Sequence, residues 1–263
     1  MILASFLCAL IGAGCAFTLT WGLSRTPSSR EASKAAPALS FVGSTTLSMF
    51  VLCLGFLVAS SWQEHGTARD HSYSEARALA TVYAAAGGLA DGDRTQVRSS
   101  LRQYVTLVVD DEWPMMGRHR SSAAAWLTLD QANGTLERLA GGAGRPTPAQ
   151  ALAVSNTSKA MEDVYQMRSQ RISDVRWTVL PQLEYALVAT GLLVLLFPAL
   201  VGINAGPRHL VMMVLLGAVL GFGIFLVISL QHPFSGPTGV SPAAYTQAVA
   251  RFDQLDAQWG ATP

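Results

Sequence analysis

Long uninterrupted runs of apolar residues alternate with polar stretches along this chain. A helix that crosses the apolar core of a bilayer needs about 20 apolar residues. Four runs approach or exceed that length, at residues 2–23, 39–62, 183–203 and 209–230. Backbone groups in lipid must be hydrogen-bonded within their own segment, so each run is predicted to form a helix. We therefore predict an all-α polytopic membrane protein with four transmembrane helices.

The loops between these runs group them into two hairpins. Residues 24–37 join the first two runs and residues 204–208 join the last two, so each pair is predicted to be antiparallel. The predicted division is a first transmembrane hairpin (1–62), a helical extramembrane domain (63–181), a second transmembrane hairpin (182–231), and a C-terminal exit turn and tail (232–263). Trp21, Trp62 and Trp177 lie at or near predicted span ends, as interfacial aromatic residues do.

The polar middle domain is predicted to be helical as well. Apolar residues recur at helical spacing in 95–111, and 73–89, 122–139 and 148–175 are also predicted helices. The last of these begins with Thr147 as N-cap and Pro148 at its first position. Asp93 is the expected N-cap of the helix 95–111. Glu112-Trp113-Pro114 is expected to end this helix, because proline disfavours helical backbone in the residue before it.

The composition agrees with a membrane protein and excludes several classes. The chain is 50% hydrophobic and 13% charged, whereas soluble domains contain about 25% charged residues. A net charge of +1 gives no field for nucleic acid, so no such partner is expected. Cys8, Cys15 and Cys53 all lie in apolar runs and are interpreted as small apolar residues. The first run lacks a basic start and a cleavage site, so it is predicted to be a retained helix.

Enzyme and metal motifs are missing from the sequence. It contains no glycine-rich phosphate loop, no nucleophile elbow and no HExxH zinc motif. We therefore expect no catalytic residues, no metal and no cofactor. A membrane enzyme stays open as a third class, which would need Asp110, Asp111 or Glu112 close to His119 or His65.

One acidic segment requires a partner for its charge. Asp110, Asp111 and Glu112 stand where the helix 95–111 is expected to end, and negative charge there opposes the helix dipole. A basic partner would offset this cost; the candidates are Arg168 and Arg171, or Arg118 and Arg120. The alternatives are an internal ion pair or solvated helix end, and a functional cation or ligand site.

The second run carries a stripe of apolar residues at four-residue spacing. Phe50, Leu54 and Val58 either pack against another helix or form a hydrophobic constriction in a pore. The serine and threonine residues earlier in the run either bond to backbone carbonyls or line a wet vestibule. No basic residue lies at mid-membrane, which argues against a proton-coupled pump and is compatible with a passive pore.

In combination, two motifs resemble the prokaryotic bestrophin-like domain family. The first is Asp111-Glu112-Trp113-Pro114, with Arg168 and Arg171 later in the chain. The second is Pro233-Phe234-Ser235-Gly236, here called the exit turn, whose spacing alone indicates an ordinary turn at the end of a helix. The family takes its name from the bestrophins, pentameric anion channels with four spans per subunit and a cytosolic middle domain. The acidic run that helps bestrophins hold calcium is absent after Phe234, so calcium gating is not expected.

The resemblance implies a homo-oligomeric membrane protein and a passive ion channel, with small inorganic anions as the expected permeant ions. In that case the second run would line the pore, with Phe50, Leu54 and Val58 as its constriction. The middle domain and both termini would be cytoplasmic; counts of basic residues near the spans barely favour this orientation. The alternative is a membrane-anchored interaction or sensing protein without a permeation path. Fold-level analogy does not by itself decide between them.

Overall fold

The computed structural model describes residues 11, 14, 18, 32–142, 147–175, 181–200, 207–230, 233–234 and 239–260. Apart from three of its residues, the predicted first span therefore lies outside the described residues. The same is true of Trp21, Trp177 and the cysteines at positions 8 and 15.

Every element in the described ranges is helical, and no strand occurs there. The elements are α2 (Ala32–Ala85), η1 (Ala86–Gly88), α3 (Asp91–Leu107), η2 (Val108–Glu112), α4 (Trp113–Met116), α5 (Ala123–Ala140), α6 (Pro148–Val175), α7 (Pro181–Leu200), α8 (Pro207–Leu230) and α9 (Ala243–Gly260). The chain forms two compact units, one from residues 1–63 and 178–231 and the other from 64–177 and 232–263. The prediction of an all-α protein is confirmed for the described residues.

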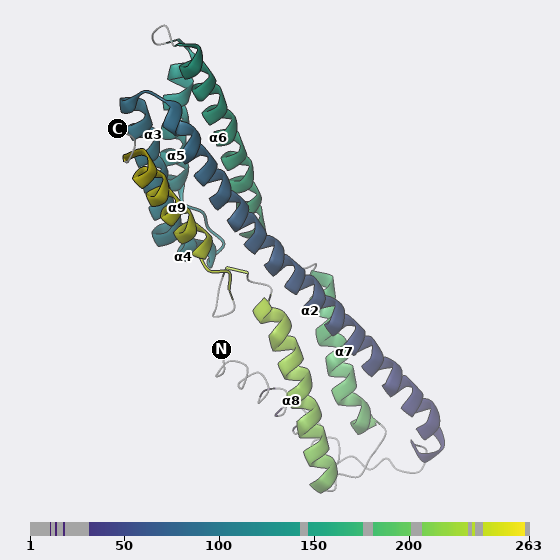
Figure 1. Ribbon diagram of the computed structural model, residues 1–263. Helices are drawn as coiled ribbons and strands as arrows, with labels where there is room; N and C mark the ends of the chain where they lie inside the picture. The colour runs from purple at the N-terminus through teal and green to yellow at the C-terminus, as the bar shows by residue number, and fades with distance from the viewer. Residues whose placement is uncertain are drawn as a thin grey trace. The chain divides into compact units, whose positions relative to one another are not determined.

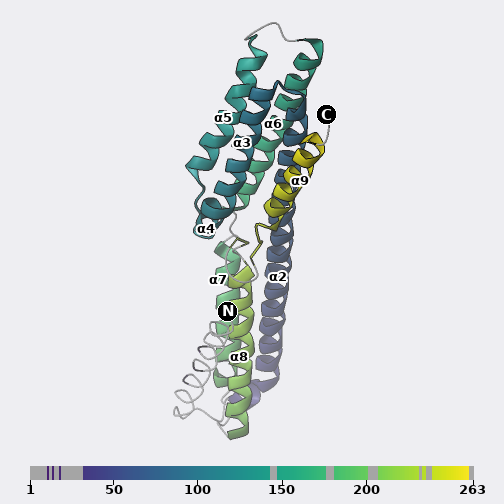
Figure 2. The same ribbon diagram turned by 60° about the vertical axis from the view of Figure 1, so that its left-hand side comes forward.

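In the first unit, α7 and α8 lie beside the first part of α2 (Figures 1 and 2). Glycines on α7 and α8 make room for large side chains of α2. A Cβ atom at Gly191 would lie 3.1 Å from Phe50 Cε2, and one at Gly223 would lie 3.0 Å from Leu54 Cδ2. The apolar stripe of α2 therefore packs into spaces left by missing side chains.

Filling one of these spaces will loosen the first unit. Gly223→Leu forces new methylene groups against Leu54, and overpacking of this kind costs about 1–3 kcal/mol. Gly55→Leu is the matched control, because a Cβ atom there meets nothing within 4 Å. We expect the control to melt no lower than wild type in detergent, and the Gly223 variant to melt several degrees lower. Equal melting temperatures for the two variants would contradict this packing.

Two of the predicted spans correspond to helices long and apolar enough to cross a membrane. These stretches are Ser40–Gly88, which covers the predicted span 39–62 except its first residue, and Leu210–Leu230, which covers 209–230 except its first residue. The third predicted span corresponds to α7, whose described apolar stretch, Tyr185–Phe197, is shorter. Trp62 is 71% exposed, as expected of an interfacial aromatic residue.

In the second unit, the later part of α2 packs with α3, α5, α6 and α9 (Figures 1 and 2). Its core is continuous and includes Leu79, Leu101, Leu129, Met161 and Phe252.

Two predicted helix starts in this unit are confirmed. The Ser122 hydroxyl accepts a hydrogen bond from the Ala125 amide at the start of α5. The Thr147 hydroxyl accepts from the Gln150 amide, and Gln150 Oε1 accepts from the Thr147 amide in return. This reciprocal pair satisfies donors that the first turn of α6 would otherwise leave free.

Three predicted helix boundaries are wrong. The helix predicted from residue 73 is not separate, because α2 runs on to Ala85; the polar segment 63–72 contains no proline and only one glycine. The helix predicted for 95–111 starts at Asp91, after Ala90, so Asp93 lies in its first turn and is not its cap. Helical structure also continues past Glu112, because Pro114 falls in the first turn of α4, where a missing N–H costs little.

Candidate functional site

The acidic segment after α3 turns its last residue into the protein interior. Residues Val108–Glu112 form a π-helical turn, a wider turn that often occurs at functional sites. Glu112 is fully buried and receives two hydrogen bonds from Arg168, Nη2 to Oε1 and Nη1 to Oε2, each 2.9 Å long. Arg171 Nη2 adds a third at 3.1 Å. Of the two candidate arginine pairs, Glu112 thus contacts Arg168 and Arg171, whereas Arg118 and Arg120 are exposed.

A second buried carboxylate completes this site. Arg171 Nε donates to Glu75 Oε2 over 2.7 Å, and Arg168 Nη1 donates to the Tyr104 hydroxyl over 2.6 Å. The Tyr104 hydroxyl in turn donates to Glu75 Oε1. We call Glu75, Glu112, Arg168 and Arg171 the arginine–glutamate cluster. Its two positive and two negative charges balance, and all four side chains have 0% exposure.

Electrostatics inside the cluster favour the charged forms of Glu112, Arg168 and Arg171. Burial alone would raise the pKa of Glu112, but the charges of Arg171 and Arg168 outweigh it and hold the pKa below its usual range. Burial and the Glu75 charge raise the pKa of Tyr104, so this hydroxyl stays protonated and can donate. The Arg168 guanidinium also lies 4.4 Å from the centre of the Trp126 ring, a cation–π distance.

The cluster is suited to holding helices together. Its carboxylates come from α2 and η2 and its guanidinium groups from α6, so it ties three elements together. Among the described residues, no group of three or more histidine, cysteine, aspartate or glutamate side chains is placed to hold a metal ion.

The two family motifs meet in the second unit. The Trp113 indole nitrogen donates to the Val240 carbonyl over 3.0 Å, and its ring meets the Phe234 ring edge-on, with 5.5 Å between centroids. The Pro233 carbonyl accepts from the Val240 amide over 2.7 Å, which closes the exit turn. Asp111 and Pro114 are exposed, and Ser235 and Gly236 lie outside the described residues.

Two of the three residues predicted to form a pore constriction pack against neighbouring helices. Phe50 is only 2% exposed and packs beside Gly191, and Leu54 packs beside Gly223. Val58 is half-buried. Helix packing, the alternative left open for this stripe, accounts for Phe50 and Leu54. Glycines on α7 and α8 leave the room that these two side chains occupy, and the assignment of the stripe as a pore constriction stays a prediction.

Sequence reasoning missed Glu75 and the docking of α9. A signal for Glu75 exists: together with Ala68, Ser72, Leu79 and Val82 it forms the buried face of a helix at three- and four-residue spacing, where a lone acid needs a partner. No comparable signal predicts α9, because its partners are far away in the sequence.

Stacking and charge together hold α9. The rings of Tyr83 and Phe252 stack with 4.1 Å between centroids. Arg98 Nη1 donates to Asp256 Oδ1 over 2.9 Å, and Arg102 Nη2 donates to Asp256 Oδ2 over 2.8 Å. The Trp259 ring occupies the place of a side chain at Gly87, where a Cβ atom would come within 2.3 Å of it.

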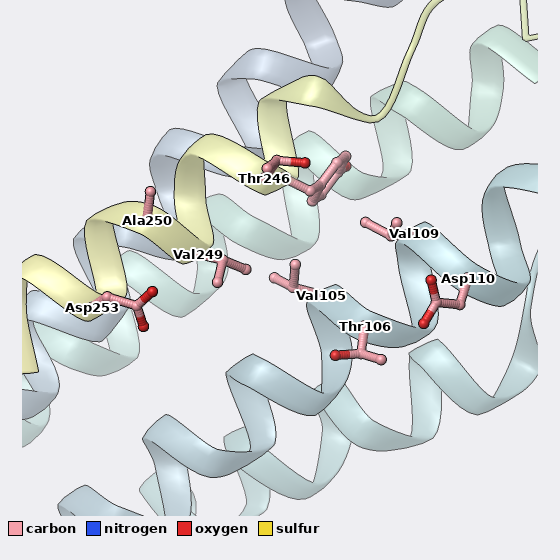
Figure 3. A pocket seen from close by; sticks show the side chains of 9 residues that line it. Val105, Thr106, Val109, Asp110, Thr246, Val249, Ala250 and Asp253 are labelled. Carbon is pink, nitrogen blue, oxygen red and sulfur yellow. The ribbon is translucent and has the colours of Figure 1, made fainter.

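A groove of about 400 Å³ lies between α9 and the end of α3 (Figure 3). Val105, Val109 and Val249 give it an apolar lining, and Asp110 and Asp253 lie toward opposite ends. The Asp253 carboxylate already accepts a hydrogen bond from Arg102 over 2.7 Å. The groove is therefore a mostly apolar surface with acidic ends.

Comparisons with known proteins agree with this architecture. Residues 10–245 match the Bestrophin-like domain. A solved structure described as the crystal structure of a membrane protein P143A aligns with a TM-score of 0.59 over 97% of each chain, at 15% identity, which shows a shared fold. No curated protein sequence matches. Because the domain match covers most of the chain, this protein belongs to the Bestrophin-like domain family and is a bestrophin-like membrane protein.

Proposed function

We propose that this protein assembles from several copies into a passive ion channel in the cell membrane. Family membership and the fold of the membrane-protein neighbour support a membrane protein. The observation that favours a channel is the exposed face of α2 opposite the packed residues Phe50 and Leu54. This face, the outer stripe, consists at helical spacing of Thr45, Ser48, Leu52, Gly55 and Ala59.

The outer stripe combines a polar segment with an apolar one, as a pore that gates by dewetting needs. The hydroxyls of Thr45 and Ser48 donate to the carbonyls of Phe41 and Ser44, which leaves their oxygen lone pairs available to water. One turn further along, Leu52 is 68% exposed and apolar. Around the axis of a homo-oligomer, such residues would form a wet vestibule followed by a hydrophobic constriction that gates by dewetting.

We further propose the membrane arrangement and the permeant ion. The arrangement has four spans, with the second unit and both termini in the cytoplasm. Small anions are the expected permeant ions, on the strength of the resemblance to bestrophins alone. A reversal potential measured across a salt gradient distinguishes anion from cation selectivity.

Leu52→Ser will increase the conductance of the purified protein in planar bilayers. A hydroxyl in place of an apolar side chain wets the constriction, so we expect a several-fold larger current at equal protein density. Leu215→Ser is the matched control, because Leu215 is 60% exposed on α8 and lies outside the outer stripe. We expect the control to conduct like wild type.

If no conductance is found, the oligomeric state of the protein decides what that result means. A folded oligomer that stays silent as wild type and as the Leu52 variant, over a range of pH and calcium, contradicts the channel. A monomer or dimer without conductance would instead favour a membrane-anchored interaction protein.

A further inference from the structure

The groove between α9 and the end of α3 has the form of a docking site for a helix (Figure 3). Two helical segments make its walls, and Val105, Val109 and Val249 line its middle. An amphipathic helix lays its apolar side chains into a groove of this kind. The chemistry at the two ends of the groove then decides which helix fits.

Each end of the groove carries an exposed carboxylate. The Asp253 side chain is 63% exposed and forms one ion pair, with Arg102. A carboxylate has about four acceptor positions, so Asp253 keeps the capacity for a further donor. Asp110, toward the other end, is exposed, and no arginine or lysine of the described residues forms an ion pair with it. A fitting helix therefore carries a positive charge at each end of a short apolar stretch.

The later part of α2 carries a stretch with this pattern. Arg69, Tyr73 and Arg77 recur at four-residue spacing, so they lie along one side of the helix, and we call them the basic stripe. Both arginines are exposed and Tyr73 is half-buried. The Arg69 guanidinium lies 5.6 Å from the centre of the Tyr73 ring. Within the described ranges, neither arginine forms an ion pair with a carboxylate, so both charges are available to a partner.

The basic stripe and the groove match in length as well as in charge. At about 1.5 Å per residue, α9 rises about 10 Å from Thr246 to Asp253, and α2 rises about 12 Å from Arg69 to Arg77. The long arginine side chains take up the difference. No residue of the basic stripe lines the groove of its own chain. The two surfaces of one copy are therefore open to two different neighbours.

We propose that the basic stripe of one copy docks in the groove of the next copy, with Tyr73 over the valines and an arginine at each acidic end. Such a contact is head-to-tail, and contacts of this kind close into rings when the rotation between copies allows it. The charged ends select the partner and fix the register, and the apolar middle is removed from water. The contact rests on the proposed assembly from several copies, but it does not depend on ion conduction.

Cross-linking of the full-length protein in detergent tests the contact. One variant carries both Tyr73→Cys and Val249→Cys, and a short bis-maleimide joins neighbouring thiols. We expect an SDS-resistant ladder that extends beyond the dimer, because each linked copy still offers a groove or a stripe to the next. The two single variants control for the three native cysteines, and we expect no ladder from either. A double variant that links only within one chain, or stops at dimers, contradicts the proposal.

Charge reversal tests the same contact without an introduced thiol. Arg69→Glu combined with Arg77→Glu sets like charges against the acidic ends of the groove. We expect the dissociation constant of the assembly, measured by sedimentation in detergent, to rise about tenfold or more. Adding Asp110→Arg to this variant should recover part of the loss, which a folding defect would not allow. Arg120→Glu is the matched control, because Arg120 is exposed on the same unit outside the stripe. An unchanged constant, or an equal loss in the control, overturns the contact.

Labelling of the groove separates the contact from the proposed channel. In the intact oligomer of the Val249→Cys variant, we expect a maleimide dye to be kept from the new thiol. A conducting oligomer that is labelled freely there and forms no ladder contradicts the contact and leaves the channel standing. A ladder from an assembly that stays electrically silent supports the contact and contradicts the channel. If the thiol is shielded in the monomer as well, another segment of the same chain covers the groove and the contact is wrong.

Discussion

Glu112→Ala will unfold much of the second unit or lower its stability by about 3–5 kcal/mol, the cost of removing one partner from a buried ion pair. The side chain is fully buried and accepts hydrogen bonds from both Arg168 and Arg171. Alanine would leave Glu75 as the one carboxylate of the cluster opposite two buried guanidinium groups, and the buried site gives water no access to replace the lost partner. Urea unfolding of the detergent-solubilised protein, followed by tryptophan fluorescence, measures the loss.

Asp111→Ala is the matched control for this prediction. Asp111 is the immediate neighbour of Glu112 but is exposed, and exposed substitutions usually change stability by about 0.5 kcal/mol or less. If the two variants unfold at the same urea concentration, the cluster does not stabilise the second unit.

The cluster also predicts how the second unit responds to acid. A carboxyl group whose pKa is lowered on folding contributes stability that is fully present above its unfolded-state pKa and is lost as pH falls through its folded-state pKa. Because the pKa of Glu112 lies below its usual range, its contribution persists through mild acid and disappears only in strong acid.

Phe252→Ala will release α9 from the second unit. The ring is fully buried and stacks on Tyr83, and a buried phenylalanine replaced by alanine costs about 3–5 kcal/mol. The ion pairs of Asp256 with Arg98 and Arg102 are partly exposed, and such pairs contribute much less, so they will not retain the helix alone. We expect proteinase K to cut the variant within α9 at concentrations that leave wild type intact.

Arg251→Ala tests whether this effect is specific to the stacked ring. Arg251 precedes Phe252 but is exposed, and its guanidinium donates to Gln254 within α9 itself. We expect this variant to resist proteinase K as wild type does. Equal resistance of the Phe252 variant would mean that charge, and not stacking, holds α9.

Much of the local structure followed from the sequence, because it depends on neighbouring residues. The caps at Ser122 and Thr147 lie within three residues of the amides they bind, so the starts of α5 and α6 were predictable. The helix end at Glu112 was mispredicted for the opposite reason. Whether Pro114 ends a helix depends on a π turn, and that turn is stabilised by arginines more than 50 residues away.

The sequence by itself determined that this is an all-helical protein with long apolar helices, since periodicity and run length act within single segments. It also presented Arg168 and Arg171 as candidate partners for an acid, from charge alone. Only the tertiary structure decided that Glu112 takes both, that Glu75 joins them, and that Phe50 packs beside Gly191. These are choices between residues far apart in the chain, and burial and shape, which exist only after folding, decide among them.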